Sequence, residues 1–241
     1  MHLELSTFSG SIKGGIFLKD PATSTLGWSI LTNSIEIIDE VGFEQFTFRK
    51  LATKMQSTEA SIYRYFENKH KLLLYLSSWY WSWAEYNLAL RNANLSSPQQ
   101  KLLHAIEQLA SPTKVNYNGM DIGRLYQVIV RESSKAYLIK EVDQLNRNGL
   151  FYNYKKFVSI LSQLILEIKS GYAYPHMLVT TIIEGIHHQR FFSEHLPSLT
   201  DMPLEGESLA DFYYSLAMAA INQKTDDLHT SSTILQTLTA E

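Results

Sequence analysis

Basic side chains are concentrated in one short stretch of the chain. From Thr47 to Lys71 there are two acidic residues, Glu59 and Glu67, and six basic ones: Arg49, Lys50, Lys54, Arg64, Lys69 and Lys71. The stretch has a formal charge of +4 while the whole chain has −3, so the remaining residues carry −7. Clustered Lys and Arg neutralise phosphate groups, so this stretch is a candidate contact for nucleic acid, although the total charge alone would argue against one.

Two short helices are expected to position these side chains. Thr47 can cap a helix over residues 48–55, in which the apolar residues have the i, i+3, i+4, i+7 spacing of a single face. Thr58 can cap a second helix that turns Ile62 and Phe66 inward. Two short helices joined by about three residues form a helix-turn-helix, whose second helix enters the major groove of DNA. That second helix would expose six side chains to DNA: Glu59, Ala60, Ser61, Tyr63, Arg64 and Tyr65.

Longer helices are expected on both sides of this pair. A broad apolar face covers Thr25 to Val41, and Gly42 follows as a left-handed stop. Asn68 can cap a long helix that continues to about Ala93. From Thr23 to about Asn222 the pattern is helical and no run of residues alternates as in a strand, so the fold should be all-α.

Three segments of this region carry a family pattern. They are Glu40-Val41-Gly42-Phe43, Thr47-Phe48-Arg49-Lys50-Leu51-Ala52 and Ala60-Ser61-Ile62-Tyr63-Arg64-Tyr65-Phe66-Glu67-Asn68-Lys69. Over residues 35–73 the sequence resembles the DNA-binding region of TetR-type transcriptional repressors, most specifically in the spacing of Tyr63, Phe66 and Lys69. The family commonly has Gly and an aliphatic residue in the turn, where this chain has Gln56 and Ser57.

The resemblance implies which side chains contact an operator in double-stranded DNA. Thr47 and Arg49 would lie at the phosphate backbone, with Lys50 nearby. Tyr63 and Tyr65 would touch phosphates or base edges, and Lys69 would reach a phosphate from the start of the long helix. The full expected set is Thr47, Arg49, Lys50, Thr58, Glu59, Ala60, Ser61, Tyr63, Arg64, Tyr65 and Lys69. A homodimer is also implied, because two recognition helices about 34 Å apart can read a palindromic operator.

The resemblance further implies a helical domain that binds a small-molecule effector. The expected organisation is an irregular N-terminal arm (1–22), a three-helix helix-turn-helix DNA-binding domain (23–72), a helical ligand-binding and dimerisation domain (73–223) and a C-terminal tail (224–241), with the long helix joining the two domains. Aromatic rings with a polar tip suit a mostly apolar pocket, although such rings are also common in cores. The candidate ligand contacts are Trp79, Trp83, Tyr86 and Tyr126.

Two late helices carry apolar stripes that could form half of an intersubunit four-helix bundle. The stripes are Val179, Ile182, Ile183 and Ile186 in one helix and Leu209, Phe212, Tyr213, Leu216 and Ala220 in the other. Gly185, Ala217 and Ala220 would allow the helices to approach closely. The alternative is that both stripes pack within one chain.

Catalysis and cofactors receive no support from the sequence. The chain has no cysteine and no HExxH, GxSxG or phosphate-loop motif, and the adjacent His187 and His188 face different directions on a helix. We therefore expect no catalytic residue, no metal and no cofactor. The uncharged stretch from Leu72 to Ala84 is shorter than the roughly 20 residues that span a bilayer, and no secretory signal is apparent, so a cytoplasmic protein without a membrane partner is expected.

These observations combine into one hypothesis about function. The chain is expected to be a homodimeric transcriptional regulator, most simply a repressor, whose operator affinity is changed by a small, largely apolar effector. Two other functions stay open. One is a helical small-molecule-binding protein with a vestigial helix-turn-helix, and the other is an α-helical enzyme that acts on a hydrophobic substrate.

Overall fold

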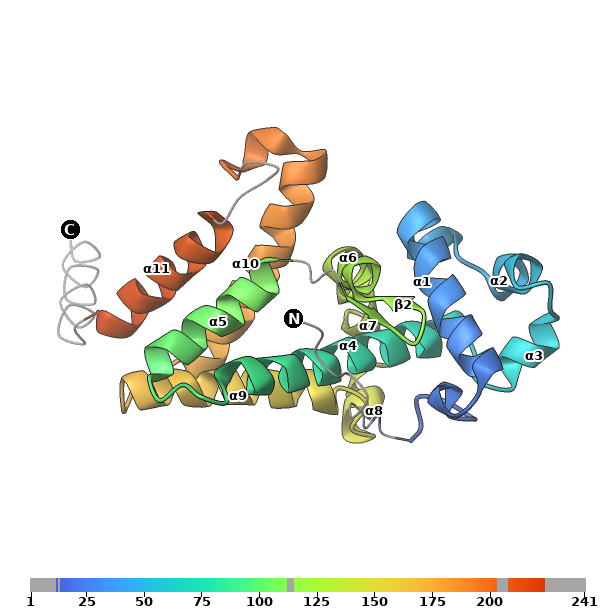
Figure 1. Ribbon diagram of the computed structural model, residues 1–241, viewed down its shortest axis with the longest axis horizontal. Helices are drawn as coiled ribbons and strands as arrows, with labels where there is room; N and C mark the ends of the chain where they lie inside the picture. Colours follow the sequence, from blue (N-terminus) through green and yellow to red (C-terminus); the bar gives the residue numbers. More distant parts are fainter. Residues whose placement is uncertain (1–11, 13, 112–114, 203–207, 224–241) are drawn as a thin grey trace, which may run out of the picture.

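Helices make up most of the computed structural model, which describes residues 12, 14–111, 115–202 and 208–223 (Figure 1). The N-terminal elements are α1 (Thr25–Gln45), α2 (Phe48–Lys54), α3 (Glu59–Tyr63) and the long α4 (Lys69–Asn92). The remaining helices are α5 (Pro98–Ala110), α6 (Ile122–Glu132), α7 (Ser134–Tyr137), α8 (Val142–Arg147), α9 (Tyr152–Ile168), α10 (Pro175–His195) and α11 (Ser208–Asn222). In Figure 1, α4 extends from the α1–α3 end into the body, where α5 and α9 pack against it. The predicted all-α architecture is confirmed.

The helix starts of the N-terminal part form where the sequence predicts them. Thr47 caps α2 by accepting a hydrogen bond from the Lys50 amide at 3.2 Å, and Thr58 caps α3 through the Ser61 amide at 3.3 Å. Asn68 caps α4 by accepting from the amide of Lys71 at 2.9 Å. A side-chain oxygen satisfies an amide that would otherwise lack a partner in the first turn, so these caps fix where each helix begins.

The first helix continues past the predicted stop. Gly42 has a φ of +78°, which side chains rarely adopt, and it interrupts α1 as expected of a glycine in this position. One more turn follows, however, and the helix ends at Gln45. The extra turn is stabilised by tertiary contacts of Phe43, whose ring is buried and whose amide is bound by a side chain from α6.

A small hairpin between α5 and α6 was not predicted. Strands β1 (Asn116–Tyr117) and β2 (Met120–Asp121) pair antiparallel around Asn118 and Gly119, which both have positive φ. Asn-Gly is the strongest short signal for such a two-residue turn. The signal is therefore present in the sequence, but the strands are too short to show alternation.

The chain ahead of α1 packs on the helix-turn-helix. Ile16 is only 1% exposed, and the Leu18 amide donates to the carbonyl of Tyr65 at 2.8 Å. The Lys71 ammonium group donates to the Gly15 carbonyl at 2.7 Å. A short 3-10 turn, Pro21–Thr23, leads into α1. The predicted C-terminal tail, 224–241, lies outside the described residues.

The apolar stripes assigned to a dimer interface are mostly packed within the chain. In α10, Val179, Ile182, Ile183 and Ile186 are at most 2% exposed, and in α11 Leu209 and Tyr213 are at most 5% exposed. A Cβ at Gly185 would overlap the Tyr213 ring, so this glycine allows α10 and α11 to approach each other within one chain. For these six residues the interface prediction is wrong. Phe212 and Leu216 are exposed and Ala220 is half-buried, so for them it stays a prediction.

No helix in the described part of the chain is both long enough and apolar enough to cross a membrane.

Candidate DNA interface and ligand cavity

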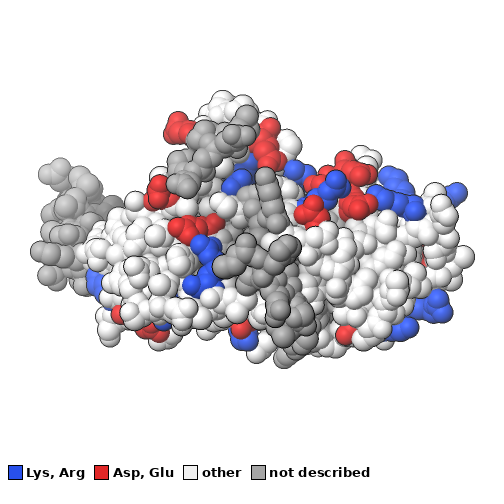
Figure 2. All heavy atoms as spheres, viewed as in Figure 1, with Lys and Arg blue, Asp and Glu red and all other residues white. Residues whose placement is uncertain are grey.

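Most of the predicted DNA contacts lie together on the surface of α2 and α3. Thr58, Glu59, Ala60, Tyr63 and Arg64 are exposed, as are Thr47, Arg49 and Lys50, and Ser61 is half-buried. Side chains of α2 and of its cap also line a shallow hollow: Thr47, Arg49, Lys50, Thr53 and Lys54. Figure 2 shows Lys and Arg atoms around this end of the molecule and acidic atoms beside them, where the end of α1 meets α6. The polar surface that a helix-turn-helix needs is thus present.

Tyr65 is not part of this surface, so its predicted contact with DNA is wrong. Its ring is 2% exposed, and its hydroxyl group lies 2.8 Å from the Ser24 hydroxyl. Because α3 ends at Tyr63, a tight turn, in which the Tyr65 amide donates to the Ile62 carbonyl at 2.8 Å, directs the ring into the protein. Tyr65 therefore joins the segment before α1 to the end of α3.

Lys69 is also used inside the protein rather than presented to a phosphate. Its ammonium group donates to the carbonyls of Phe43, Glu44 and Phe46 at 2.9, 3.0 and 3.2 Å. A cation at the C-terminal end of a helix satisfies carbonyls that have no partner in the helix and interacts favourably with its dipole. The predicted phosphate contact is therefore wrong, and Lys69 closes the end of α1 instead.

Other positive charges of the basic stretch are already paired. Lys54 lies 2.7 Å from a Glu36 carboxylate oxygen, and Lys71 is bound to the carbonyl of Gly15. Lys50 donates to the carbonyl of Gln45 at 2.9 Å but stays exposed, and an ammonium group has two further protons to donate. The cations best placed for DNA are therefore Arg49, Lys50 and Arg64.

The unusual turn between α2 and α3 takes the geometry that a glycine would favour. Gln56 has a φ of +50°, the left-handed conformation. Around it the Ser57 amide donates to the Ala52 carbonyl at 2.9 Å and the Gln56 amide to the Thr53 carbonyl at 3.2 Å, which is the Schellman pattern of a helix end. The chain thus keeps the turn geometry without the glycine.

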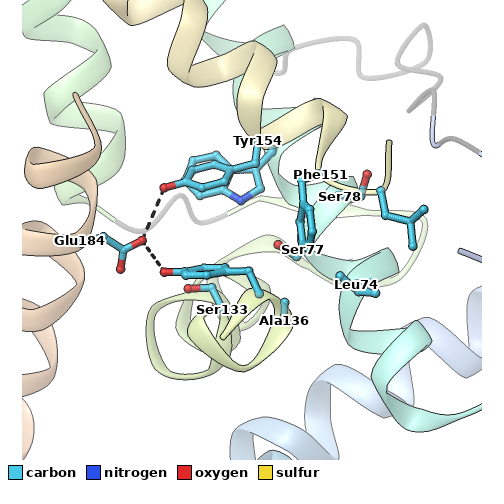
Figure 3. A pocket seen from close by; sticks show the side chains of 11 residues that line it. Leu74, Ser77, Ser78, Ser133, Ala136, Phe151, Tyr154 and Glu184 are labelled. Carbon is cyan, nitrogen blue, oxygen red and sulfur yellow. Dashed lines mark hydrogen bonds between the residues drawn. The ribbon is translucent and has the colours of Figure 1, made fainter. Parts of the chain in front are cut away.

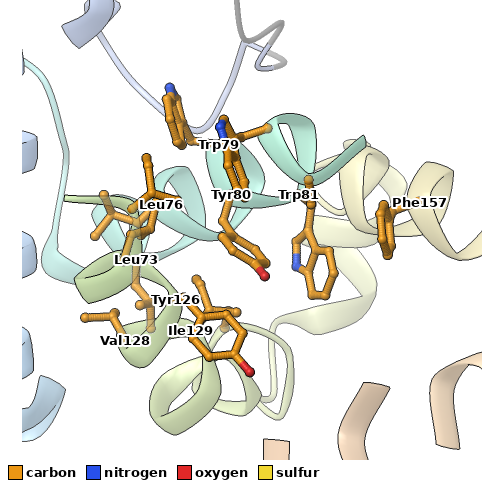
Figure 4. Close-up of a cluster of buried hydrophobic side chains, with 14 of the residues drawn as sticks. Leu73, Leu76, Trp79, Tyr80, Trp81, Tyr126, Val128, Ile129 and Phe157 are labelled. Atoms are coloured by element: carbon orange, nitrogen blue, oxygen red, sulfur yellow. The ribbon is translucent and has the colours of Figure 1, made fainter. Parts of the chain in front are cut away.

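The four aromatic residues predicted to contact a ligand do not line the cavity. Trp79, Trp83 and Tyr126 are at most 3% exposed, and the Tyr126 hydroxyl donates to the Leu109 carbonyl at 2.7 Å. Tyr86 is half-buried and packs against the same core. Figure 4 shows Trp79 and Tyr126 within a cluster of side chains from α4 and α6. Because α4 is aromatic on several faces, its sequence does not distinguish the face that packs from the face that lines a cavity.

A cavity lies instead on another face of α4, next to α7, α9 and α10. Its lining residues are Leu74, Ser77, Ser78, Trp81, Ser133, Ala136, Tyr137, Leu150, Phe151, Tyr154 and Glu184. The hydroxyls of Tyr137 and Tyr154 both donate to Oε1 of Glu184, at 2.8 and 3.4 Å (Figure 3). Burial is the main cause that raises the pKa of both phenols, so they are neutral donors at physiological pH.

Sequence reasoning did not select Glu184, although a signal for it exists. It is the only Asp or Glu of α10 before Glu194, and it follows an apolar segment.

The cavity has room for about one water molecule, with a volume of about 20 Å³.

A larger groove of about 460 Å³ adjoins this cavity. Ser133, Tyr137 and Glu184 line both spaces and so form the wall between them. His187 lines the groove, is 3% exposed, and has no hydrogen-bond partner at either ring nitrogen. Burial lowers its pKa from 6.5 to about 4, so the imidazole is neutral at pH 7.

The segment at the end of α6 contacts both the cavity and the helix-turn-helix domain. Buried Glu132 accepts a hydrogen bond from the Phe43 amide at 3.0 Å through Oε1 and pairs with Lys135 at 2.6 Å through Oε2. The Arg131 guanidinium group lies 3.1 Å from Asp39 in α1 and 3.2 Å from Glu194 in α10. Residues 131–137 therefore connect the cavity wall directly to α1.

No group of three or more His, Cys, Asp or Glu residues within the described ranges is arranged to hold a metal ion.

Comparison with known proteins shows a similarity in sequence over the N-terminal helices. The sequence model of the bacterial regulatory proteins of the tetR family matches residues 30–76. No curated protein sequence matches the chain.

Three similar solved structures illustrate the fold. A bacterial regulatory protein in the tetR family from Rhodococcus RHA1 has 14% identity and a TM-score of 0.58, over 83% of this chain and 99% of that one. AibR, in complex with isovaleryl coenzyme A and operator DNA, has 17% identity and a TM-score of 0.55, over 78% and 95%. A putative transcriptional regulator from Saccharomonospora viridis, in complex with choline, has 16% identity and a TM-score of 0.53, over 81% and 95%. The helix-turn-helix region of this chain is therefore similar in sequence to the bacterial regulatory proteins of the tetR family over residues 30–76, and the chain has the fold of the three solved structures.

Proposed function

We propose that the protein is a transcriptional regulator that binds operator DNA through α2 and α3. The observation that carries this proposal is the exposed set of Arg49, Lys50, Tyr63 and Arg64 on a helix-turn-helix of the tetR family. Arg49 and Lys50, on α2, would bind phosphates and set the position of α3. Tyr63 packs edge-to-face on Phe48, with ring centroids 5.0 Å apart, and its half-exposed ring would reach a base edge or phosphate.

A small effector would change operator affinity by moving the segment 131–137. The cavity wall and the Glu132–Phe43 hydrogen bond belong to this one segment, so a ligand that displaces Tyr137 would pull on the end of α1. Such a ligand would favour one of two domain orientations and shift their populations. We propose that ligand binding releases the protein from DNA, so that the effector relieves repression.

A homodimer would bring two recognition helices to a palindromic operator. Phe212 and Leu216 of α11 are 58% and 41% exposed, and their spacing places them on one face of that helix. An exposed apolar face suits an interface between two copies. We place the contact on this outer face of α11, with Ala220 at its edge.

The test is operator binding by the purified protein. DNA fragments flanking its own gene should contain a site that it binds in preference to unrelated DNA. Arg49→Ala should weaken binding and reduce the slope of log affinity against log salt by about one, because one phosphate contact is lost. Arg147→Ala is the matched control, since Arg147 is exposed on α8 in the body and its loss should change neither value.

The outcomes separate the candidate functions. If no fragment is preferred and Arg49→Ala equals Arg147→Ala, the helix-turn-helix does not bind DNA. A small-molecule-binding protein with a vestigial helix-turn-helix would then be the better description.

A further inference from the structure

We propose that the effector is an organic cation, a quaternary ammonium or protonated amine, held by Glu184 among the rings of Trp81, Tyr137 and Tyr154. This inference rests on the proposed function because it specifies the ligand class of the effector site. All four residues line the cavity, and Figure 3 shows the Tyr154 and Glu184 side chains converging there.

The charge inside the cavity has one sign. Of its eleven lining residues only Glu184 has a carboxyl group, and none is Lys, Arg or His. The two tyrosine hydroxyls bind the same oxygen of Glu184, Oε1, so these bonds leave Oε2 for another partner. A cationic ligand would supply the opposite charge that this half-buried carboxylate lacks within the cavity.

The rings around Glu184 have the chemistry of an aromatic cage. The Trp81 and Tyr154 rings pack on each other with centroids 4.7 Å apart, so a cation would have to meet the faces that this contact leaves uncovered, and the phenol of Tyr137 reaches the same carboxylate oxygen as that of Tyr154. The faces of Trp and Tyr rings attract cations, and quaternary ammonium ligands are bound in this way. Phe151 adds a further ring to the lining.

Three basic residues line the groove next to the cavity: Arg131, His187 and the exposed His188. His187 is neutral, since its burial disfavours the charged form. Arg131 lines the groove, but its guanidinium group is paired with both Asp39 and Glu194. An anionic ligand would instead meet the carboxylate of Glu184 without a free cation from Arg131 or His187.

Entry to the cavity requires a movement that would report ligand binding. The cavity is too small for an organic cation, whereas the adjoining groove of about 460 Å³ is not. Tyr137 separates the two spaces and is held to Glu184 by one hydrogen bond of 2.8 Å. A cation that binds Glu184 would separate the Tyr137 hydroxyl from Oε1 and shift this residue, which lies in the segment that contacts α1, while its ring stays beside the ligand.

The experiment is calorimetric titration of the DNA-free protein with two cations, choline and benzyltrimethylammonium. The matched probe is the neutral isostere of choline, in which a carbon replaces the nitrogen, and isovaleryl coenzyme A is the anionic probe. At least one cation should bind at least about tenfold more tightly than the neutral isostere. Glu184→Gln should abolish this preference, while Glu107→Gln, which removes a surface carboxylate paired with Arg91, should keep it.

Two further variants test whether the Trp81 and Tyr154 rings bind the cation or only maintain the structure of the cavity. Tyr154→Phe keeps the ring face and should retain the preference for the cation, whereas Trp81→Leu should reduce it. The proposal is overturned if neither cation binds better than the neutral isostere, or if isovaleryl coenzyme A binds and Glu184→Gln strengthens its binding. The wild-type titrations decide the matter even if a variant does not fold. Operator binding without ligand tests the proposed function separately, so the two failures are distinguishable.

Discussion

Replacement of Glu132 tests the connection between the body and the helix-turn-helix domain. Glu132 is 6% exposed and accepts the hydrogen bond of the Phe43 amide, which Gly42 leaves without a helical partner. Glu132→Ala would bury that amide unpaired, at a cost of about 1–3 kcal/mol. It would also break the ion pair with the partly exposed Lys135, which contributes about 0–1 kcal/mol. We expect the free energy of unfolding to fall by about 3 kcal/mol.

Two companion variants divide this loss between its causes. Glu132→Gln keeps an acceptor for the Phe43 amide and should lose about 1 kcal/mol, and Lys135→Ala should lose less than about 1 kcal/mol. Urea denaturation followed by circular dichroism measures all three values. If Glu132→Ala loses no more stability than Lys135→Ala, the hydrogen bond to Phe43 does not stabilise the domain contact and the reasoning is refuted.

Four other expectations follow from the structure. Gln56→Gly should raise the free energy of unfolding by about 1 kcal/mol, because glycine takes the left-handed conformation without strain; an unchanged denaturation midpoint would contradict this. Tyr65→Phe should lose about 1 kcal/mol through its bond to Ser24 and leave operator affinity unchanged; weaker DNA binding in a gel-shift assay would return Tyr65 to the interface. Because burial lowers the pKa of His187 from 6.5 to about 4, the protein should lose stability as the pH falls from about 6.5 to 4. Over the same pH range the His187→Phe variant should lose less stability, as measured by the melting temperature at each pH. Phe212→Glu should shift the protein to monomer in analytical ultracentrifugation, and an unchanged sedimentation coefficient would exclude this face as the dimer contact.

The features that sequence reasoning located correctly depend on neighbours in the chain. Thr47, Thr58 and Asn68 each cap a helix through an amide three residues ahead, so the motif itself contains both partners. The left-handed interruption at Gly42 is likewise a property of one residue. The all-α fold follows from such local signals repeated along the chain.

The corrected residues depend on partners far away in the sequence. Tyr65 is bound by Ser24, and Lys69 by carbonyls more than twenty residues earlier, so a position in a helix-turn-helix motif could not show that either side chain is internal. The apolar stripe of α10 correctly predicted that its residues are buried. It did not show that they pack against other helices of the same chain and not against a second copy. Aromatic content identified α4 as important, but the cavity face was set by α7 and α10, which the sequence does not place beside it.

The binding of Lys69 to the end of α1 has a mechanical consequence. Three carbonyl contacts from one ammonium group join the start of α4 to the end of α1, while the arm residues join the same start of α4 through Lys71. We expect these helices to turn together, so that a small rotation of α4 within the body would carry α3 with it. Regulation would then change the angle and the separation at which the two copies of α3 in a dimer meet the DNA, and would leave each helix-turn-helix intact. The contacts of Lys69 would keep α1 and α4 from moving relative to each other.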